Sequence, residues 1–238
     1  MGSTPTVLMI HSPLIGSSTW RPCADLLRKA SYEVKAPSLS HALVSGPPYY
    51  ERMSDYLAST IPATAEVVAI IAHSGAGALV PAVAERLHAR CYGIFVDAIL
   101  PHPGKSWFET VPAQLRAHLL ALGRDGTLPQ WDRWFSAGTI GTLLPDASVR
   151  ERFIAELPRV PLNYLEEHAP SASVDALVEC GYLQLRRSYE DIAAKAEQLG
   201  WLALREMADH LAILTRPKMV CAAIVRVFEA LNLCPIGR

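Results

Sequence analysis

The sequence has little charge and no excess of either sign. Only 19% of its 238 residues are charged, and 22 Lys and Arg side chains almost balance 23 Asp and Glu, which gives a formal net charge of -1. No dense run of Lys or Arg occurs. Proteins that bind nucleic acid through its phosphates present a basic surface. We therefore expect no nucleic acid partner. Because half of the residues are hydrophobic, we also exclude a disordered, collagen-like or coiled-coil chain.

The cysteines form no framework. Their number is odd and no pair has C-x-x-C spacing, which argues against a disulfide scaffold or a zinc knuckle; they are Cys23, Cys91, Cys180, Cys221 and Cys234. No H-x-x-x-H pair or carboxylate cluster recurs on one face, and the first apolar run ends in His-Ser-Pro instead of a glycine-rich dinucleotide loop. We therefore expect no metal, no cofactor, and cysteines that are buried or incidental thiols.

Long apolar runs are also missing. The longest clean run, residues 67–72, is far too short to span a bilayer, and the first six residues carry no basic segment of a signal peptide. The expected protein is cytoplasmic, does not enter a membrane, and has a small molecule as its partner. Its oligomeric state is left open.

Short apolar runs rich in β-branched residues alternate with longer segments of helical spacing. The predicted strands are 7–10, 32–35, 67–72, 92–96, 181–185 and 201–204, and the predicted helices are 20–29, 49–60, 76–90, 189–199 and 217–231. This alternation predicts an α/β fold whose mostly parallel sheet is covered by helices on both faces. The length fits one domain, with or without an inserted lid.

The alternation stops near residue 103 and does not clearly resume until 181. The interval is rich in proline, has helical spacing at 111–122, and holds three of the five tryptophans. We expect a helical lid at 103–160, inserted into a core formed by 1–102 and 161–238. Its aromatic side chains suggest a pocket for a hydrophobic ligand, although a helical layer packed on its own core explains them equally well. They are Trp107, Phe108, Trp131, Trp134 and Phe135.

Residues 67–77, V-V-A-I-I-A-H-S-G-A-G, are typical of a buried strand that runs into Ser74 and then into a helix. A serine on a sharp strand-to-helix turn needs small residues two positions before and after it, and Ala72 and Ala76 meet that need. The turn also puts the Gly75 N–H at a helix N-terminus, where it can stabilise a developing oxyanion. The alternative is a glycine-rich turn that merely links strand to helix.

This segment resembles the nucleophile elbow of the α/β-hydrolase superfamily, G-x-S-x-G, with alanines at positions 72 and 76 in place of the glycines. Residues 7–20 are similar to the strand and loop that supply the second oxyanion donor in that superfamily. His11 and Trp20 have the spacing seen in small plant esterases and hydroxynitrile lyases. The resemblance extends over the whole chain, and it implies an α/β-hydrolase fold with Ser74 as nucleophile.

The oxyanion loop departs from the family pattern. The common form has His-Gly followed by a donating amide, but this chain has His11-Ser12-Pro13, and proline has no N–H. The hole then rests on the Gly75 N–H with either the Leu14 N–H or the Ser12 hydroxyl. One missing donor costs on the order of 10²–10³ in rate. Plant hydroxynitrile lyases carry a threonine at the position of Ser12, so a hydroxyl here suits a lyase as well as an esterase.

The resemblance implies a histidine base near the C-terminus. Of the eight histidines, His210 has that position, and its role is to take the Ser74 proton and return it to the leaving group. His73 flanks the nucleophile, and we expect its side chain to turn away.

The acid of the family usually follows the strand at 181–185, where this chain has Ser188. Asp97 instead ends the strand at 92–96, four residues before a proline, and resembles the carboxylate that orients the histidine in haloalkane dehalogenases. A buried carboxylate also needs a partner, such as His210, although a loop salt bridge is the alternative. Glu166 and Glu167 are the fallback acids.

Three functions fit the sequence. The first is a cofactor-independent serine hydrolase for a small hydrophobic ester, thioester or lactone. The second is a lyase or elimination enzyme on the same fold, in which His210 is the base and no acyl-enzyme forms. The third is a catalytically silent protein that binds a small molecule. Haloalkane dehalogenation is excluded, because those enzymes attack with an aspartate where this chain has Ser74.

Overall fold

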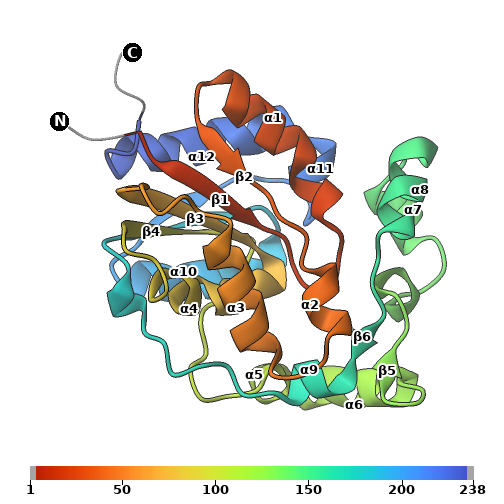
Figure 1. Cartoon of the computed structure of the whole chain (residues 1–238). Helices are drawn as coiled ribbons and strands as arrows, with labels where there is room; N and C mark the ends of the chain where they lie inside the picture. Colours follow the sequence, from red (N-terminus) through yellow and green to blue (C-terminus); the bar gives the residue numbers. More distant parts are fainter. Residues whose placement is uncertain (1–3, 235–238) are drawn as a thin grey trace.

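The computed structural model describes residues 4–234. Within them, six strands form one sheet in the order β2-β1-β3-β4-β7-β8, and every neighbouring pair is parallel. These strands are β1 (Thr6–Ile10), β2 (Glu33–Lys35), β3 (Val67–His73), β4 (Arg90–Val96), β7 (Cys180–Gln184) and β8 (Leu202–Arg205). The predicted fold class, a parallel sheet flanked by helices, is confirmed (Figure 1). No helix in this part of the chain is both long and apolar enough to cross a bilayer.

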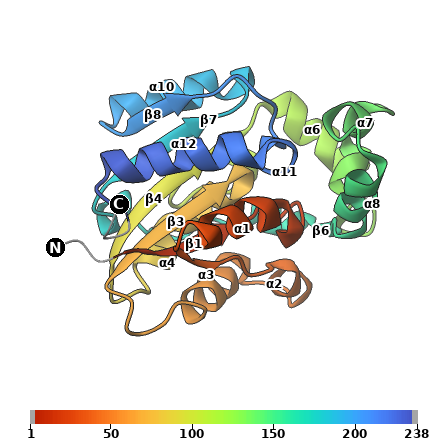
Figure 2. The same ribbon diagram turned by 90° about the horizontal axis from the view of Figure 1, so that it is seen from above.

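Alternate side chains of the strands enter two separate cores. Ile70 and Phe95 face a core covered by α3 (Tyr49–Ser59), α4 (Val80–Ala84) and α10 (Glu190–Gln198). Ile71 and Ile94 face the opposite core, covered by α1 (Arg21–Lys29), α11 (Ala212–Thr215) and α12 (Pro217–Ala230). Figures 1 and 2 show these helices on the two sides of the sheet. The short helix α2 (Ser40–Val44) precedes α3. The five cysteines are free thiols, and four of them are buried.

One of the predicted helices is wrong in type and length. Residues 76–90 form the end of a 3₁₀ helix, η2 (Ser74–Leu79), followed by α4, which ends at Ala84. Pro81 has no N–H, so it cannot make the i→i−4 bond to Gly77 that an α-helix beginning at 76 requires. The predicted helices that correspond to α1, α3, α10 and α12 agree with the structure to within one residue at each end.

Four neighbouring strands end at the same edge of the sheet. The parallel register places Ile10, Ala72, Phe95 and Tyr182 in one row across β1, β3, β4 and β7. The direction in which the chain adds strands to the sheet changes between β1 and β3. From β1 the chain adds β2 on one side, and from β3 it adds β4, β7 and β8 on the other. Ligands of open α/β sheets bind at such a switch point, beyond the carboxyl ends of the strands. The loops that follow these strands carry the candidate site.

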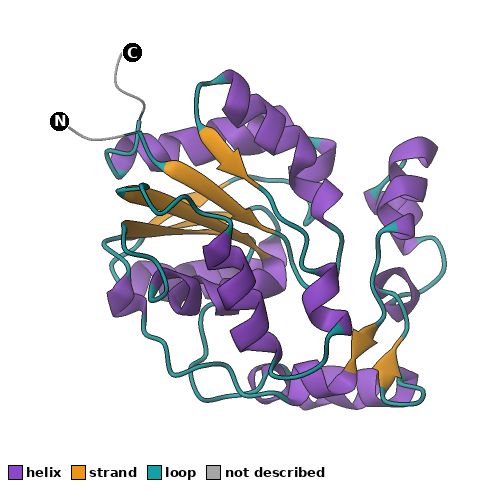
Figure 3. Cartoon of the chain, viewed as in Figure 1, coloured by secondary structure: helices purple, strands orange, loops and turns teal. Residues whose placement is uncertain are grey.

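The chain leaves the core after β4 and returns before β7. The insertion contains α5 (Trp107–Thr110), α6 (Ala113–Leu122), β5 (Thr127–Leu128), η3 (Trp131–Trp134), α7 (Thr139–Leu143), α8 (Ala147–Ala155), β6 (Val160–Pro161) and α9 (Leu162–Glu166). Figure 3 shows that it is mainly helical, with β5 and β6 as a small antiparallel pair. Its base is closed where Gly104 N–H donates to Ala169 and Ala169 N–H donates to Lys105. These bonds put the return to the core nearer 169 than 160.

Two contacts fix the insertion on the core. Ile140 of α7 packs in one cluster with Ile15 and Leu211. The carboxylate of Glu156 accepts the Ser18 N–H at 3.0 Å, just before the start of α1. Because Ile15 follows the predicted oxyanion loop and Leu211 follows the predicted base, the insertion packs against the loops that carry both.

Candidate active site

Ser74 lies on the turn between β3 and η2 with a φ of +56°. A left-handed φ is uncommon for a residue with a side chain and marks a sharp, strained turn. Ala72 and Ala76 are completely buried beside it. Gly77 is required here, because a Cβ on it would lie 1.9 Å from the carbonyl oxygen of Ile99. The small residues around Ser74 are therefore the ones that this turn needs.

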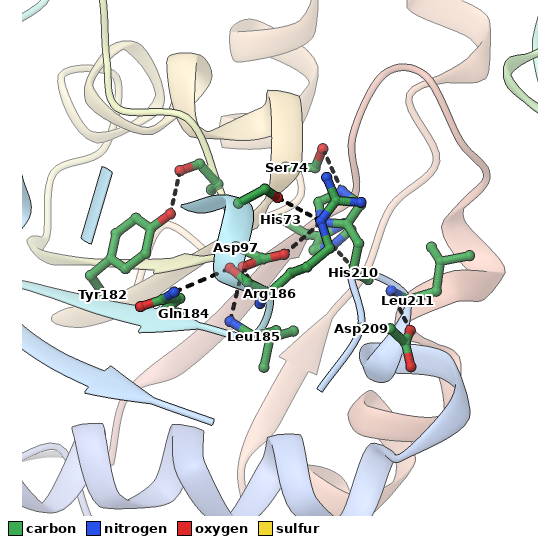
Figure 4. Close-up of polar contacts among 12 residues, drawn as sticks. His73, Ser74, Asp97, Tyr182, Gln184, Leu185, Arg186, Asp209, His210 and Leu211 are labelled. Carbon is green, nitrogen blue, oxygen red and sulfur yellow. Dashed lines mark hydrogen bonds and ion pairs between the residues drawn. The ribbon is translucent and has the colours of Figure 1, made fainter. Parts of the chain in front are cut away.

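The structure brings Ser74, His210 and Asp97 into one line of hydrogen bonds (Figure 4). The Nε2 atom of His210 lies 3.0 Å from Ser74 Oγ, and its Nδ1 atom lies 2.7 Å from Asp97 Oδ2. Asp97 is completely buried and His210 is 7% exposed. Bonds shielded from water in this way are stronger than exposed ones.

The backbone after β7 holds the Asp97 carboxylate in place. Its Oδ1 atom accepts the N–H groups of Leu185 and Arg186, at 2.9 and 3.0 Å (Figure 4). The backbone just after Asp97 is fixed by Tyr182, whose hydroxyl donates to the carbonyl of Ala98 at 2.8 Å. With the bond to His210, the buried carboxylate thus has three partners, as a buried charge requires.

The two fallback acids lie elsewhere. The carboxylate of Glu167 accepts the N–H groups of Tyr49 and Tyr50, at 2.9 and 2.8 Å, and so satisfies the first turn of α3. Glu166 is exposed on α9. Neither side chain bonds to His210, whose Nδ1 atom is taken by Asp97.

The oxyanion loop brings the Ser12 hydroxyl next to the elbow. Its Oγ atom lies 3.2 Å from where a Cβ on Gly75 would be, so the hydroxyl faces Gly75. The Leu14 N–H donates to the same oxygen at 3.3 Å. Of the two donors that the sequence leaves open, the Leu14 amide is therefore engaged with Ser12, and the Ser12 hydroxyl proton is the one available beside Gly75.

His11 and Trp20 hold this loop against the sheet. The Leu39 N–H donates to His11 Nε2 at 2.9 Å, so the imidazole proton is on Nδ1, which donates to the Ser12 carbonyl at 2.8 Å. Burial lowers the pKa of His11 to about 4, which keeps the ring neutral. The Trp20 indole N–H donates to the Ile10 carbonyl at the end of β1, at 3.1 Å.

His73 supports the backbone of the base, a role that its position beside the nucleophile does not predict. Its Nε2–H donates to the His210 carbonyl at 2.9 Å, and the two imidazole rings lie 4.5 Å apart (Figure 4). Burial, with a smaller effect of His210, holds the pKa of His73 well below its usual value. A neutral ring carries its proton on the nitrogen that donates. Sequence alone gives no signal for this contact, because it joins residues 137 positions apart.

The five aromatic side chains of the insertion differ in their surroundings. Phe108 and Trp134 are buried in the larger core, Trp107 and Trp131 are partly buried, and Phe135 is 43% exposed. The Trp131 ring makes an edge contact with Phe135 at 4.8 Å. Packing within the insertion therefore accounts for part of this set, and a role in a ligand pocket stays a prediction.

A cavity of about 510 Å³ opens between the insertion and α11 with the residues on either side of that helix. Its walls are residues 142–146, Val149, Asp209 and residues 214–216. Asp209 precedes the candidate base, but none of the three hydrogen-bonded site residues lines this space. The cavity therefore lies beside the site.

Comparison with solved structures identifies the fold, whereas no family model and no curated protein matches the sequence. The chain is similar to an extracellular α/β-hydrolase from a Paenibacillus species, described as structurally and functionally homologous to tobacco salicylic acid binding protein 2. The two share 20% identity and a TM-score of 0.74 over 94% of this chain and 98% of that chain.

Two further structures are similar over nearly their whole length. Polyneuridine aldehyde esterase is 18% identical with a TM-score of 0.66, over 94% of this chain and 99% of that chain. Tomato methylketone synthase I, in complex with 2-tridecanone, is 13% identical with a TM-score of 0.68, over 96% of this chain and 99% of that chain. The chain therefore has the α/β-hydrolase fold, as its elbow motif predicts.

Proposed function

We propose that this protein is a cofactor-independent serine hydrolase that acts on a small hydrophobic ester, thioester or lactone through an acyl-enzyme on Ser74. The observation that carries the proposal is the unbroken hydrogen-bonded line from Ser74 through His210 to Asp97. Nucleophile, acid and base also follow one another in the chain order of α/β-hydrolases. The similar structures include proteins named as a hydrolase and an esterase, which supports this class without specifying a substrate.

In the acylation step, Ser74 Oγ attacks the acyl carbon as its proton moves to His210 Nε2, 3.0 Å away. The imidazolium then gives that proton to the leaving atom as its bond to the acyl carbon breaks. The Asp97 carboxylate accepts the hydrogen bond from His210 Nδ1–H and stabilises the imidazolium. In the second step a water molecule loses a proton to His210, attacks the acyl carbon, and Ser74 leaves with the proton returned.

The oxyanion is held by the Gly75 N–H and the Ser12 hydroxyl. Gly75 supplies its amide at the beginning of η2, and the Ser12 oxygen faces it. A hydroxyl that accepts from the Leu14 amide has its proton free to donate to the substrate oxygen. This arrangement replaces the amide that Pro13 lacks.

The preference for an apolar acyl group comes from the insertion. It rests on the partly buried Trp107 and Trp131 in an insertion that packs against both catalytic loops. An apolar wall of this kind excludes water and favours hydrophobic substrates.

A second candidate function is elimination or lyase chemistry, and the observation that favours it is the hydroxyl donor at Ser12 next to Pro13. In that reaction His210 removes a proton from the substrate, and the Ser12 and Ser74 hydroxyls orient it without forming a covalent bond. A protein that only binds its ligand is the third candidate.

The test is the intact mass of the protein after exposure to a fluorophosphonate probe. We expect one adduct on the parent, none on Ser74→Ala, and a strongly slowed reaction on His210→Ala. His88→Ala, which alters an exposed histidine in the loop before β4, at the edge of the sheet opposite the site, is the matched control and should label like the parent. Absence of an adduct on the folded parent would contradict acyl-enzyme hydrolysis and favour elimination or binding.

A further inference from the structure

His73 and Ser74 are consecutive residues at the end of β3, and both bind the same residue. The Ser74 hydroxyl lies 3.0 Å from His210 Nε2, and the His73 Nε2–H donates to the His210 carbonyl at 2.9 Å (Figure 4). The candidate base is therefore joined to the end of one strand twice, through its side chain and through its backbone. Only the first of these two bonds belongs to the line of three residues that carries the proton.

The alternation of side chains along β3 explains how two neighbours reach one residue. Successive side chains of a strand point to opposite faces, so His73 shares a face with Ile71. Ile71 lies in the core covered by α11 and α12, and α11 begins two residues after His210. Ser74, with its left-handed φ of +56°, leaves the strand pattern and presents its hydroxyl to the imidazole. The backbone of the base thus faces one residue and its ring the next.

The His73 imidazole is a fixed and neutral donor. It is completely buried, and the Trp20 ring meets it edge-on with 6.0 Å between centroids. Its Nδ1 atom has no hydrogen-bond partner among the described residues, so no other group there competes for the ring. Burial, with a smaller effect of His210, holds the pKa of His73 well below its usual value. A proton taken up by His210 therefore stays on that ring, because a second positive charge 4.5 Å away is disfavoured.

The loop that carries the base needs such an anchor. Residues 206–211 lie between β8 and α11 and form no regular secondary structure. The Glu206 and Ala208 N–H groups attach the first part of this loop to backbone carbonyls at the end of β7 and just after it, at 2.8 and 2.9 Å. The bond from His73 fixes the backbone of the base itself. A displacement of about 1 Å at a reacting group costs on the order of 10² in rate.

We propose that His73 is a positioning residue of this site: its bond to the His210 carbonyl holds the base so that Nε2 stays within hydrogen-bond distance of Ser74. Because the His73 side chain has no exposed surface, it acts through His210 and not on the substrate. The inference rests on the proposed function through the role of His210 as base. The elimination reaction gives His210 the same role.

The test compares substitutions of His73 that differ in one donor. His73→Gln places an amide N–H close to the position of Nε2, whereas His73→Met has the same length and no donor. His73→Asn is the second variant without the bond, because its amide is one methylene shorter and does not reach the carbonyl. The matched control is His118→Met, which removes another histidine-to-carbonyl bond, from Nε2 to Trp134 at 3.2 Å within the insertion. Thermal unfolding checks that each variant is folded.

The first measurement is the rate of the fluorophosphonate reaction at several probe concentrations, which separates the maximal rate kinact from the binding constant KI. One hydrogen bond is worth roughly 3- to 10-fold in rate. We expect His73→Met and His73→Asn to lower kinact by about this factor and to leave KI unchanged. His73→Gln should restore most of kinact, and His118→Met should match the parent. Equal kinact values for His73→Gln and the two variants without the bond, or a change in KI alone, would overturn the positioning role.

The second measurement is the proton NMR signal of His210 Nδ1–H, which bonds to Asp97 at 2.7 Å in a buried place and should appear at low field. It should persist in His73→Gln and broaden in His73→Met, where a less fixed base exchanges this proton faster with water. Equal signals in these two variants would contradict the inference. If the parent shows the signal but takes no adduct, the proposed hydrolase fails and the NMR comparison still decides the role of His73. A parent with neither would overturn both.

Discussion

Asp97 reaches His210 from the end of β4, with 2.7 Å between Asp97 Oδ2 and His210 Nδ1. The position after β7, where the family resemblance places the acid, carries Ser188, and its hydroxyl accepts a bond from the Arg186 side chain at 2.6 Å. The backbone of the same loop donates to Asp97 Oδ1. The loop after β7 thus holds a carboxylate that comes from the end of β4. This carboxylate in turn keeps the His210 imidazole in its orientation.

Asp97→Asn should slow formation of the fluorophosphonate adduct by roughly 10²–10⁴, because an amide no longer holds the Nδ1–H tautomer or stabilises the imidazolium. The rate is measured from intact mass at several times at pH 7.

The matched control is Glu167→Gln. It should label at the parent rate and lose roughly 0.5–2 kcal/mol of stability at the start of α3, comparable to the loss of a helix cap. If Asp97→Asn reacted at the parent rate and Glu167→Gln reacted much more slowly, the acid would be Glu167 and not Asp97.

The oxyanion loop gives a pair of opposite predictions. Ser12→Ala should lower kcat/KM for p-nitrophenyl butyrate on the order of 10²-fold, because it removes one of two donors, and Ser12→Thr should retain most of the activity. Pro13→Gly should raise kcat/KM, because it adds an N–H donor to the oxyanion hole. The Pro13 ring carbon Cδ lies 3.9 Å from where a Cβ on Gly75 would be, and the new N–H takes the place of the bond to that carbon. An unchanged rate in Ser12→Ala would mean that a different group completes the hole.

Sequence reasoning reaches the strands and the nucleophile because their signals are local. A parallel strand buried on both faces is a continuous run of branched apolar residues, such as 67–72, and few other elements share that pattern. The elbow around Ser74 is recognised by its small neighbours, since the turn has no room for larger ones. Asp97 and His210 need the superfamily resemblance as well, because nothing close to them in sequence shows that they meet.

The contacts that sequence reasoning misses depend on strand order and register. His73 meets the His210 carbonyl, and Tyr189 meets the His210 ring, only because β3, β4 and β7 end at one edge. The helix expected at 76–90 fails for a local reason, the proline at 81, which periodicity alone does not weigh. Apolar spacing thus finds elements, whereas the neighbours of each site residue follow from how the sheet assembles.

Gly77→Ala should cost about 3 kcal/mol of stability or more, because the new Cβ would meet the Ile99 carbonyl oxygen at 1.9 Å and displace the loop after Asp97. Labelling of Ser74 should slow as well, since the Ile99 N–H bonds to the Ser74 carbonyl. Gly141→Ala on α7 is the matched control. It has no atom within 4 Å of the new methyl and should gain roughly 0.5–1 kcal/mol. Equal urea midpoints for the two variants would contradict the close approach at Gly77.

The buried His11 imidazole should make the protein less stable in mild acid. Its pKa is about 4 in the folded chain because it is buried, against 6.5 for an unperturbed histidine. Between pH 4 and 6.5 the unfolded chain binds a proton at His11 that the folded chain does not. The free energy of unfolding therefore rises with pH across this range, and it falls as the pH drops from 6.5 to 4. For His11 alone the loss is about 3 kcal/mol at most.

Urea unfolding at pH 4.5, 5.5, 6.5 and 7.5 measures this loss of stability. His11→Gln should show a shallower dependence even if its stability is lower, whereas the exposed His88→Gln should keep the parent slope. Burial also lowers the pKa values of His73 and His102, so part of the dependence should remain in His11→Gln. The same slope in His11→Gln and the parent would mean that this imidazole does not hold the oxyanion loop in its neutral form.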